Sequence, residues 1–424
     1  MDIENTEIQG KESTLMINPY SDNNKRPSKK TITGNKALTY ISLFSSAGVG
    51  CYGFLNNGFQ CIATNELIER RINVQRANKK CKYDSGYIVG DISDPVKKTE
   101  LFNEIEVYKK NEKVNEVDVI IATPPCQGMS VANHKKTENE IVRNSLVVEA
   151  IGIISKVKPK FFIFENVQAF MKTKCYSNSV QMKISEAINL HLGSDYAYVD
   201  KVLNFKDYGA NSSRTRTVVI GVRNDIATNV TPEQLFPSRE KEKTLRDVIK
   251  DIPHLNEMGE ISDNDIYHSF KPYKPHMRKW IENLSEGESA FDNTDLELRP
   301  HRLVDGIIVP NVNKNGDKYK RQEWDSVAPC IHTRNDIMSS QNTVHPTDDR
   351  VFSIRELMLL MNIPDEFKWV DIDEEELNAL DFGEKRKFLK QNEINIRQSI
   401  GEAVPTIILS KIARNIANAY EMSN

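Results

Sequence analysis

The sequence predicts an α/β protein in which a mainly parallel sheet carries helices on both faces. Short apolar runs alternate with polar, helix-capable stretches through the first half of the chain. The runs cover residues 37–44, 60–65, 87–90, 117–122 and 161–165, and the clearest helical stretches cover 66–78 and 146–156. Strands separated by helices need crossover connections, which give parallel pairing. Two later runs, 197–205 and 217–222, lack a full helix between them and predict an antiparallel hairpin at the edge of the sheet.

The alternation of strands and helices stops after about residue 223. From 225 to roughly 350 the chain is rich in Asn, Asp, Pro and Lys, which predicts a second, smaller and loop-rich domain. Helical periodicity resumes over 353–361 and again over 406–420. We expect the closing helix to pack back on the first domain. The predicted parts are a polar arm at 1–36, a first domain at 37–224 and 396–424, and a second domain at 225–395.

The composition is that of a globular chain. It has 424 residues, of which 39% are hydrophobic, and this length is sufficient for two domains. No run approaches the roughly eighteen apolar residues of a membrane span, and the first thirty residues lack the apolar core of a signal peptide. We therefore expect a soluble, cytoplasmic protein. The six cysteines show no paired spacing, so neither a metal site nor a disulfide is predicted.

The charge balance does not by itself mark a nucleic-acid binder. The formal net charge is -3, whereas proteins that contact many phosphates usually carry a basic surface. Net charge does not describe the local field, however, and the run 371–376 concentrates acidic residues in one stretch. Basic residues recur between 271 and 334, so a DNA-facing surface is compatible with the sequence.

Pro124-Pro125-Cys126-Gln127 follows the apolar run 117–122 at the point where a catalytic loop would begin. The two prolines restrict the backbone and remove two amide donors, so the direction of the thiol is largely fixed. A stiff loop suits a nucleophile, which must attack one atom. The alternative is that Cys126 is a small buried hydrophobic residue, the commoner state of a cysteine after a strand.

Three further segments bear on this choice. The buried run 161–167 contains Glu165 near its end, and Arg214 and Arg216 lie just before another apolar run. The segment 42–50 closes the first predicted strand with a turn of small residues. Taken singly, the carboxylate could cap a helix and each arginine could form a surface ion pair. Their order along the chain is more informative than any one of them.

In this order and spacing the motifs resemble the DNA cytosine 5-methyltransferases that use S-adenosylmethionine, from about residue 37 onward. Residues 355–358 with 363–367 resemble the segment that organises the recognition domain of that family, and 398–404 resemble its closing motif. The resemblance implies a Rossmann-like S-adenosylmethionine-dependent methyltransferase sheet and a loop-rich target-recognition domain. The implied substrate is double-stranded DNA.

The resemblance also implies a role for each site residue. Cys126 would attack carbon 6 of cytosine, and Glu165 would hold nitrogen 3. Arg216 would stabilise the carbonyl oxygen, while Arg214 would orient Glu165 or the loop. The implied cofactor residues are Phe44, Ser45, Ser46, Ala47, Gly48, Glu66, Asp91, Ile92 and Pro124, and the substrate-loop residues are Gln127, Ser130 and Arg143. The cofactor itself carries the methyl electrophile, so no metal is needed.

The chain departs from the family pattern at several positions. They are Ser42, Ser46 and Val49 in the cofactor loop, Ser212 before the arginines, and Glu402 and Ala403 in the closing motif. The loop commonly has an aspartate and more glycine, and the closing motif usually has an Asn-Ser pair. A serine or valine at a turn that requires a positive φ costs about 1 kcal/mol or more.

We expect a monomer that flips the target cytosine out of the duplex and acts alongside a separate restriction endonuclease. Residues 250–350, including 324–333, are expected to read the bases. Two alternatives stay open: an enzyme that methylates cytosine in RNA, and a catalytically silent DNA-binding module. The long second domain favours duplex DNA. The joint presence of the four implied catalytic residues favours an enzyme.

Overall fold

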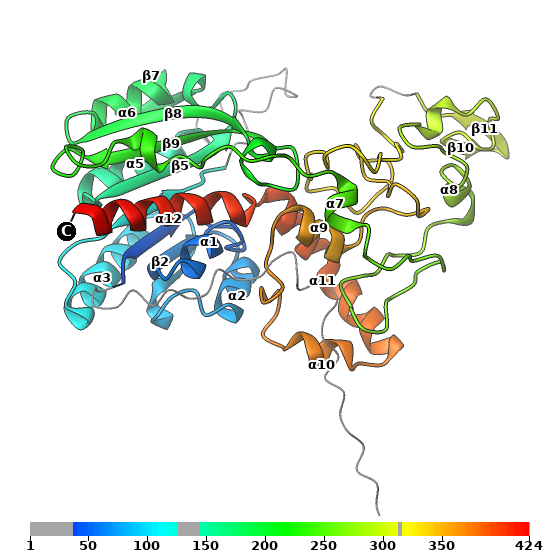
Figure 1. The fold of residues 1–424 in the computed structure, drawn as a ribbon, viewed down its shortest axis with the longest axis horizontal. Helices are drawn as coiled ribbons and strands as arrows, with labels where there is room; N and C mark the ends of the chain where they lie inside the picture. The colour runs from blue at the N-terminus through cyan, green and yellow to red at the C-terminus, as the bar shows by residue number, and fades with distance from the viewer. Residues whose placement is uncertain (1–36, 126–143, 313–315, 424) are drawn as a thin grey trace, which may run out of the picture.

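The computed structural model describes residues 37–125, 144–312 and 316–423. The predicted arm at 1–36 lies outside these residues. Figure 1 shows a sheet covered by helices and, beside it, a part of the chain in which loops dominate. In the described residues, no helix is long and apolar enough to cross a membrane.

The central sheet has seven strands in the order β3-β2-β1-β4-β5-β9-β8 within the described chain. Their bounds are Thr39–Leu43 for β1, Gln60–Glu66 for β2, Tyr87–Val89 for β3, Val119–Ala122 for β4, Phe161–Val167 for β5, Tyr196–Asn204 for β8 and Thr215–Arg223 for β9. The pairs from β3 to β5 are parallel, and β9 runs antiparallel to both β5 and β8. The predicted fold class and the hairpin at the edge of the sheet are confirmed.

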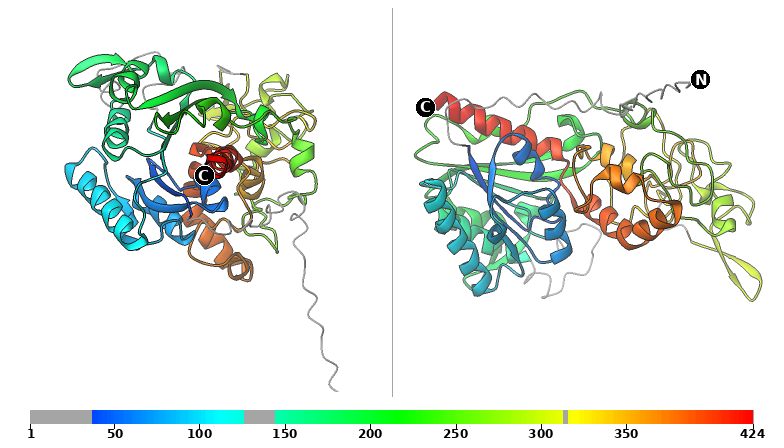
Figure 2. Two further views of the ribbon diagram at one scale, coloured as in Figure 1. Left: turned by 60° about the vertical axis from the view of Figure 1, so that its left-hand side comes forward. Right: turned by 90° about the horizontal axis from the view of Figure 1, so that it is seen from below.

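Helices cover both faces of this sheet. They are α1 (Tyr52–Asn56), α2 (Glu69–Ala77), α3 (Pro95–Glu112), α5 (Leu146–Val157), α6 (Ile184–Leu192) and α12 (Thr406–Ser423). Side chains of β1 alternate between two buried clusters: Ile41 packs with α3, α5 and α6, and Tyr40 packs with α1 and α12. In α12, Ile408, Ile412 and Ile416 repeat at helical spacing and are fully buried. The expectation that the closing helix returns to the sheet is confirmed (Figure 2).

The register of the parallel strands brings the ends of distant segments together. Leu43 pairs with Asn65 on one side and with Ala122 on the other, and Ala122 in turn pairs with Phe164. The residue that follows each of these four therefore lies at the carboxyl edge of the sheet. Ligand sites of open α/β sheets form at this edge, in the crevice outside the strand ends.

The loop-rich part contains short elements and one long helix. The elements are α7 (Leu245–Ile249), α8 (Pro275–Lys279), β10 (His301–Val304), β11 (Ile307–Pro310), α9 (Ile354–Leu360), α10 (Glu374–Asn378) and α11 (Phe382–Glu402). A small hairpin, β6 (Lys174–Ser177) with β7 (Val180–Lys183), lies beside the sheet domain. The 21 residues of α11 were not predicted as a helix, because its buried apolar residues are sparse among charged ones.

Two buried clusters organise the loop-rich part. One combines Leu357 of α9 and Ile400 of α11 with Ala47 and Val49, which belong to the predicted cofactor loop. The other is separate and centres on aromatic residues, among them Trp280. The first cluster packs α9 and α11 against the sheet domain, and the end of α11 lies at the carboxyl edge.

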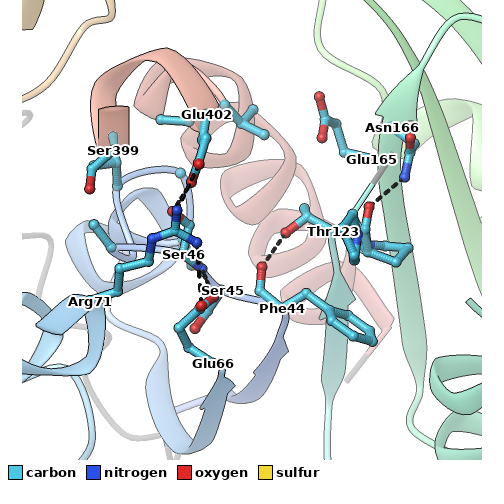
Figure 3. A pocket seen from close by; sticks show the side chains of 18 of the residues that line it. Phe44, Ser45, Ser46, Glu66, Arg71, Thr123, Glu165, Asn166, Ser399 and Glu402 are labelled. Carbon is cyan, nitrogen blue, oxygen red and sulfur yellow. Dashed lines mark hydrogen bonds and ion pairs between the residues drawn. The ribbon is translucent and has the colours of Figure 1, made fainter. Parts of the chain in front are cut away.

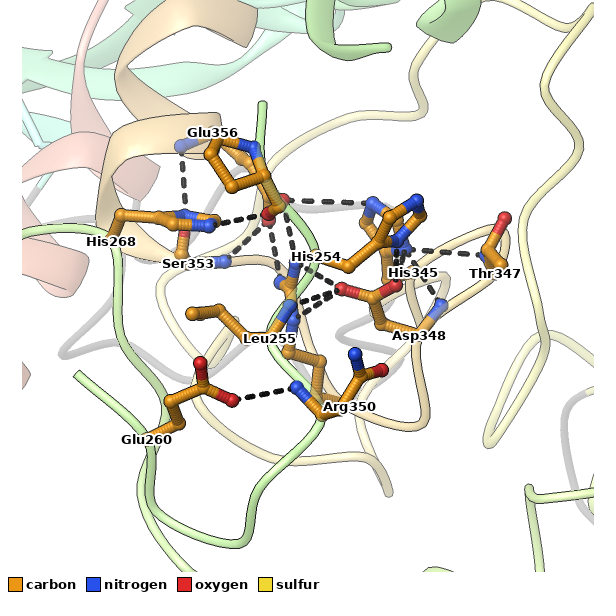
Figure 4. A network of polar contacts seen from close by, with 12 residues as sticks. His254, Leu255, Glu260, His268, His345, Thr347, Asp348, Arg350, Ser353 and Glu356 are labelled. Atoms are coloured by element: carbon orange, nitrogen blue, oxygen red, sulfur yellow. Dashed lines mark hydrogen bonds and ion pairs between the residues drawn. The ribbon is translucent and has the colours of Figure 1, made fainter. Parts of the chain in front are cut away.

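A buried polar network fastens the chain at the start of α9 (Figure 4). The guanidinium of Arg350 lies between two carboxylates: Nη2 is 2.7 Å from Oδ2 of Asp348, and Nη1 is 2.8 Å from Oε2 of Glu356. Glu356 also accepts the backbone N–H of Ser353 at 2.7 Å, and the Ser353 side chain caps the helix in return. Burying these charges is costly, and their multiple hydrogen bonds offset that cost.

His345 belongs to the same network. Its Nδ1 accepts the backbone N–H of Asp348 at 2.9 Å, and its Nε2 lies 3.5 Å from Oε1 of Glu356. Burial lowers the pKa of His345 to about 4, with Arg350 acting in the same direction against the attraction of the two carboxylates. The imidazole is therefore neutral at neutral pH, where its Nδ1 is free to accept hydrogen bonds.

This depressed pKa makes folding stability depend on pH. The unfolded chain binds a proton at His345 near pH 6.5 and the folded chain only near pH 4, so stability is complete above 6.5 and falls as the pH drops towards 4. The loss is roughly 3 kcal/mol at most. We expect His345→Gln, which does not titrate, to flatten the slope of unfolding free energy between pH 6.5 and about 4.5. Urea unfolding of both proteins at several pH values measures this slope.

Above pH 4.5 the effect of His345 can be measured apart from that of the carboxylates in the network. The pKa values of Asp348 and Glu356 are both lowered, so the stability that these carboxylates contribute is lost only at more acid pH. His276→Gln, at an exposed histidine, is the matched control and should keep the wild-type slope. Equal slopes in the wild type and His345→Gln would contradict the assignment.

Candidate active site

A cavity of about 910 Å³ opens at the carboxyl edge of the sheet. The sheet domain contributes the ends of β1, β2, β4 and β5, and the loop-rich part contributes residues 330–333 and the end of α11. Figure 3 shows two ends of this cavity: Glu66, Arg71 and Glu402 lie at one, and Glu165 and Asn166 at the other. Most of the predicted cofactor residues and, of the predicted catalytic residues, Glu165, Arg214 and Arg216 therefore line one cavity.

The turn after β1 forms part of the cavity wall. Phe44 and Ser46 have positive φ values, 55° and 46°, and Gly48 follows with 81°. Such values are unfavourable for residues with a side chain, as the departure from glycine at Ser46 predicted, whereas Val49 is not among the residues with positive φ. Tertiary contacts hold the turn: the Ser45 amide donates to the carbonyl of Asn65 at 3.0 Å.

Not every predicted cofactor residue faces the cavity. Phe44, Ser45, Ser46, Ala47, Glu66, Asp91, Ile92 and Pro124 line it. Gly48 does not line it, because it turns towards α2: a Cβ there would lie 2.9 Å from Cγ of Gln75. Its role is to allow the turn. Asp91 accepts the N–H and the hydroxyl of Ser93 through Oδ1, each at 2.8 Å, which leaves Oδ2 outside this turn.

Glu66 ends β2 and is held by backbone and side-chain donors. Its Oε2 accepts the amide of Ser46 at 2.8 Å, and its Oε1 accepts the amide of Ile68 at 3.1 Å and Nη1 of Arg71 at 3.3 Å. A carboxylate offers about four lone-pair sites, so one on Oε2 stays open in this arrangement. This acceptor, at the strand end of an α/β sheet, has the chemistry required to bind a ribose hydroxyl.

Glu165 occupies the other end of the cavity and is almost completely buried. Burial raises the pKa of its carboxyl above the ordinary value, while Arg216 and, more weakly, Arg214 oppose that rise. Nε of Arg216 lies 3.4 Å from Oε1, yet this oxygen accepts no hydrogen bond from any residue that the structure describes. The group is thus a carboxyl that can hold a proton and present it to the cavity.

Arg214 has a different setting from its neighbour. Its Nη1 donates to the carbonyls of Gly401 at 3.2 Å and Ile331 at 3.4 Å, and its Nη2 donates to that of Glu402 at 3.3 Å. The carbonyls of Gly401 and Glu402 lie at the end of α11, where the helix dipole favours a cation. These hydrogen bonds fix the backbone at residues 331, 401 and 402, and the two roles implied for Arg214 stay predictions.

Asn166 fixes the chain that enters the catalytic loop. Its Nδ2 donates to the carbonyl of Pro124 at 2.8 Å, and its Oδ1 accepts the amide of Val167 at 2.9 Å. The acid at 165 and the loop after β4 are therefore linked through adjacent residues. Cys126, Gln127, Ser130 and Arg143 lie outside the described residues, so their predicted roles stay predictions.

Residues 330–333 line the cavity, although the sequence suggested only that this neighbourhood reads bases. Burial, followed by Arg214 and Arg216, lowers the pKa of His332. Arg71 and His332 were not selected from the sequence, because their proximity to the cavity arises from contacts between distant segments. Asn166 was not selected either, although it directly follows Glu165 in β5. In the described part of the chain, no group of His, Cys, Asp or Glu could hold a metal ion.

Comparison with known proteins identifies the family. A model of the C-5 cytosine-specific DNA methylases matches residues 38–418. The chain belongs to the C-5 cytosine-specific DNA methylases. Type II methyltransferase M1.HgaI of Avibacterium volantium is 30% identical to this methylase over 92% of the chain and 99% of that relative. Type II methyltransferase M.DdeI of Desulfomicrobium norvegicum is 26% identical over 91% of the chain and 90% of that relative. With these relatives, the methylase is of the restriction-modification type.

Solved structures agree on the fold. A putative DNA modification methyltransferase encoded within an E. coli prophage superposes on the methylase with a TM-score of 0.62 at 20% identity, covering 91% of this chain and 100% of that one. The Dnmt2 methyltransferase of S. pombe gives a TM-score of 0.51 at 14% identity, covering 91% of this chain and 99% of that one. At these identities the likeness concerns the fold alone.

The contact between α11 and residues 332–333 requires a glycine. A Cβ on Gly401 would lie 2.5 Å from the carbonyl carbon and oxygen of His332 and from the amide nitrogen of Thr333. We expect Gly401→Ala to push this cavity wall away from α11 and to lower the unfolding free energy by about 1 to 3 kcal/mol. Thermal unfolding and the rate of DNA methylation measure the two effects.

Gly152 provides the matched control. It lies inside α5, and a Cβ there would meet no atom within 4 Å. Gly152→Ala should therefore raise the unfolding free energy by about 0.5 to 1 kcal/mol through helix propensity alone. If the two alanine variants were equally stable, the close approach at Gly401 would have no energetic consequence.

Proposed function

We propose that this methylase transfers the methyl group of S-adenosylmethionine to carbon 5 of a cytosine flipped out of duplex DNA, through a covalent adduct with Cys126. The observation that carries the proposal is Glu165: a buried carboxyl of raised pKa that shares one cavity with Arg216 and with the turn after β1. Membership of the family supplies the reaction class.

The chemistry requires activation of the pyrimidine ring, because carbon 5 of cytosine is a poor nucleophile. The Cys126 thiolate adds to carbon 6, a carbon–sulfur bond forms, and the electron pair of the carbon 5–carbon 6 double bond moves into the ring towards nitrogen 3 and the carbonyl oxygen. Carbon 5 then takes the methyl group. Loss of the proton on carbon 5 and departure of the thiolate restore the aromatic ring.

Glu165 and Arg216 suit the charge that develops in this step. A protonated Glu165 donates to nitrogen 3, and the guanidinium of Arg216 can stabilise the carbonyl oxygen. The opposing effects on Glu165, burial against two nearby arginines, support a carboxyl that both holds and releases a proton. Arg214 supports the same site indirectly, because it binds the backbone that faces these groups.

The residues at the other end of the cavity fit the cofactor. Glu66 has an open acceptor site for a ribose hydroxyl, the turn after β1 approaches with its backbone, and Ile92 supplies a buried apolar contact. Asp91 offers an acceptor for the adenine amino group. When bound, S-adenosylmethionine would supply an electrophilic methyl group, so the protein itself needs to provide only orientation and exclusion of water.

The remaining parts of the proposal concern the biological setting. Flipping the base costs a few kcal/mol, which DNA contacts of the predicted substrate-loop residues Gln127, Ser130 and Arg143 and of the loop-rich part would offset. We propose that the methylase acts in the cytoplasm as a monomer beside a separate cognate endonuclease, so that methylation protects host DNA. The Type II names of its relatives support the restriction-modification setting.

The decisive experiment is trapping of the covalent adduct. We expect duplex DNA containing 5-fluorocytosine at the recognition site to form a denaturation-resistant complex with the methylase and labelled S-adenosylmethionine, because fluorine at carbon 5 prevents the final elimination. Cys126→Ser should give no adduct while it still binds the cofactor. An adduct with Cys126→Ser would refute the nucleophile. Adduct formation on structured RNA alone would favour the RNA enzyme, and no methylation of any DNA would favour the silent binding module.

A second prediction concerns the acid. We expect Glu165→Gln to slow methyl transfer by roughly 10²-fold, because an amide cannot transfer a proton to nitrogen 3. The active form is protonated, so the wild-type rate should fall as the pH rises through the raised pKa of Glu165, and the variant should lose this limb of the pH profile. Single-turnover rates at saturating DNA and cofactor measure both.

Glu104 is the matched control for this change. It is also a buried carboxyl whose pKa is raised by burial, but it lies on α3 and does not line the cavity. Glu104→Gln should leave the single-turnover rate and its pH dependence as in the wild type. If both variants slowed transfer equally, the effect would come from general destabilisation and not from proton transfer.

A further inference from the structure

Four groups close a ring of hydrogen bonds at the cofactor end of the cavity (Figure 3). Ser46 donates to two carboxylates: its amide to Oε2 of Glu66 at 2.8 Å, and its hydroxyl to Oε2 of Glu402 at 3.1 Å. Arg71 donates to the same two: Nη1 to Oε1 of Glu66 at 3.3 Å, and Nη2 to Oε1 of Glu402 at 2.7 Å. Two donors thus join two acceptors from four segments of the chain.

Two members of this ring are among the positions at which the chain departs from the family pattern. Ser46 stands where glycine is common, and Glu402 stands where the closing motif usually has asparagine. The two residues are 356 positions apart and bond to each other directly. Ser46 has a φ of 46°, which is unfavourable for a residue with a side chain, and its two hydrogen bonds offset part of this cost.

The charges in the ring explain why Arg71 is needed. Glu66 and Glu402 would repel each other across Ser46, and one guanidinium between them replaces this repulsion with two ion pairs. The side chains of Arg71 and Glu66 are 15% and 7% exposed, so solvent screens their pair weakly. Arg71 therefore restricts the Glu66 carboxylate to one orientation.

We propose that Ser46, Arg71 and Glu402 are positioning residues that hold the Glu66 carboxylate ready for a ribose hydroxyl of the cofactor. The inference rests on the proposed cofactor of the methylase. Arg71 of the ring and the amide of Ile68 donate to Oε1 of Glu66, and the amide of Ser46 donates to Oε2. The remaining acceptor site on Oε2 therefore has a single direction. A preformed acceptor binds a hydroxyl without first losing rotamer freedom.

The experiment compares two ligands by calorimetry in the absence of DNA. The probes are S-adenosylhomocysteine and its analogue without both ribose hydroxyls, and the proteins are wild type, Arg71→Met, Glu402→Gln and the double variant. We expect each single change to raise the dissociation constant of S-adenosylhomocysteine about fivefold or more. The constant for the dihydroxyl-free analogue should stay unchanged, because the ring acts through the ribose. The double variant should bind no more weakly than Arg71→Met, because Glu402→Gln keeps an acceptor for the Ser46 hydroxyl and Glu402 otherwise acts through Arg71.

Arg76→Met is the control on the same helix. Arg76 pairs with Asp84 and does not line the cavity, so both dissociation constants should equal those of the wild type. Thermal unfolding of each variant, measured alongside, detects a general loss of folding.

The outcomes separate the two levels of the proposal. If the wild type bound neither S-adenosylmethionine nor S-adenosylhomocysteine, the proposed cofactor would be wrong. If the wild type bound them and the ring variants bound S-adenosylhomocysteine equally well, the cofactor would stand and the positioning role would be refuted. Equal weakening of both ligands would also refute it, because the ring would then not act through the ribose hydroxyls.

Discussion

The guanidinium of Arg214 connects three parts of the chain that are remote in sequence. It projects from the residue before β9 and donates to carbonyls of residue 331 and of the last turn of α11. A buried cation needs such partners, because an uncompensated charge in a dry interior is strongly unfavourable. The same contacts bring the loop-rich part against the carboxyl edge of the sheet. These hydrogen bonds and the apolar cluster of Ala47, Val49, Leu357 and Ile400 together hold the two walls of the cavity against each other.

This arrangement also sets the electrostatics of the acid. Burial and the adjacent Arg216 lower the pKa of Arg214, yet an arginine whose ordinary pKa exceeds 12 keeps its charge. Glu165 thus experiences two opposing influences, desolvation that favours its neutral form and two cations that favour its ionised form. In the proposed reaction Glu165 holds a proton and then releases it, and neither influence alone would suit that role. The fold sets burial against the charges of Arg216 and Arg214 at one carboxyl.

Features that depend on local periodicity could be predicted from the sequence. The alternating strands, the edge hairpin and the closing helix follow from apolar spacing, and motif order suggested which residues share an edge. The sequence did not reveal α11, whose buried face has only a few apolar residues such as Ile396 and Ile400. Nor did it assign Gly48 to the turn instead of the cavity. Arg71 and His332 were missed because their roles arise from tertiary contacts that no single segment encodes.

The departures from the family pattern illustrate the same limit. Read one at a time, Ser46 is a strained substitution for glycine and Glu402 is a lost polar contact. In the structure the two form one hydrogen bond, and Arg71 neutralises the charge that Glu402 introduces. A glycine at 46 would remove a donor that Glu402 uses, and an asparagine at 402 would remove an ion pair that Arg71 uses. The structure therefore links the two departures through one contact between residues 356 positions apart, which neither segment reveals by itself.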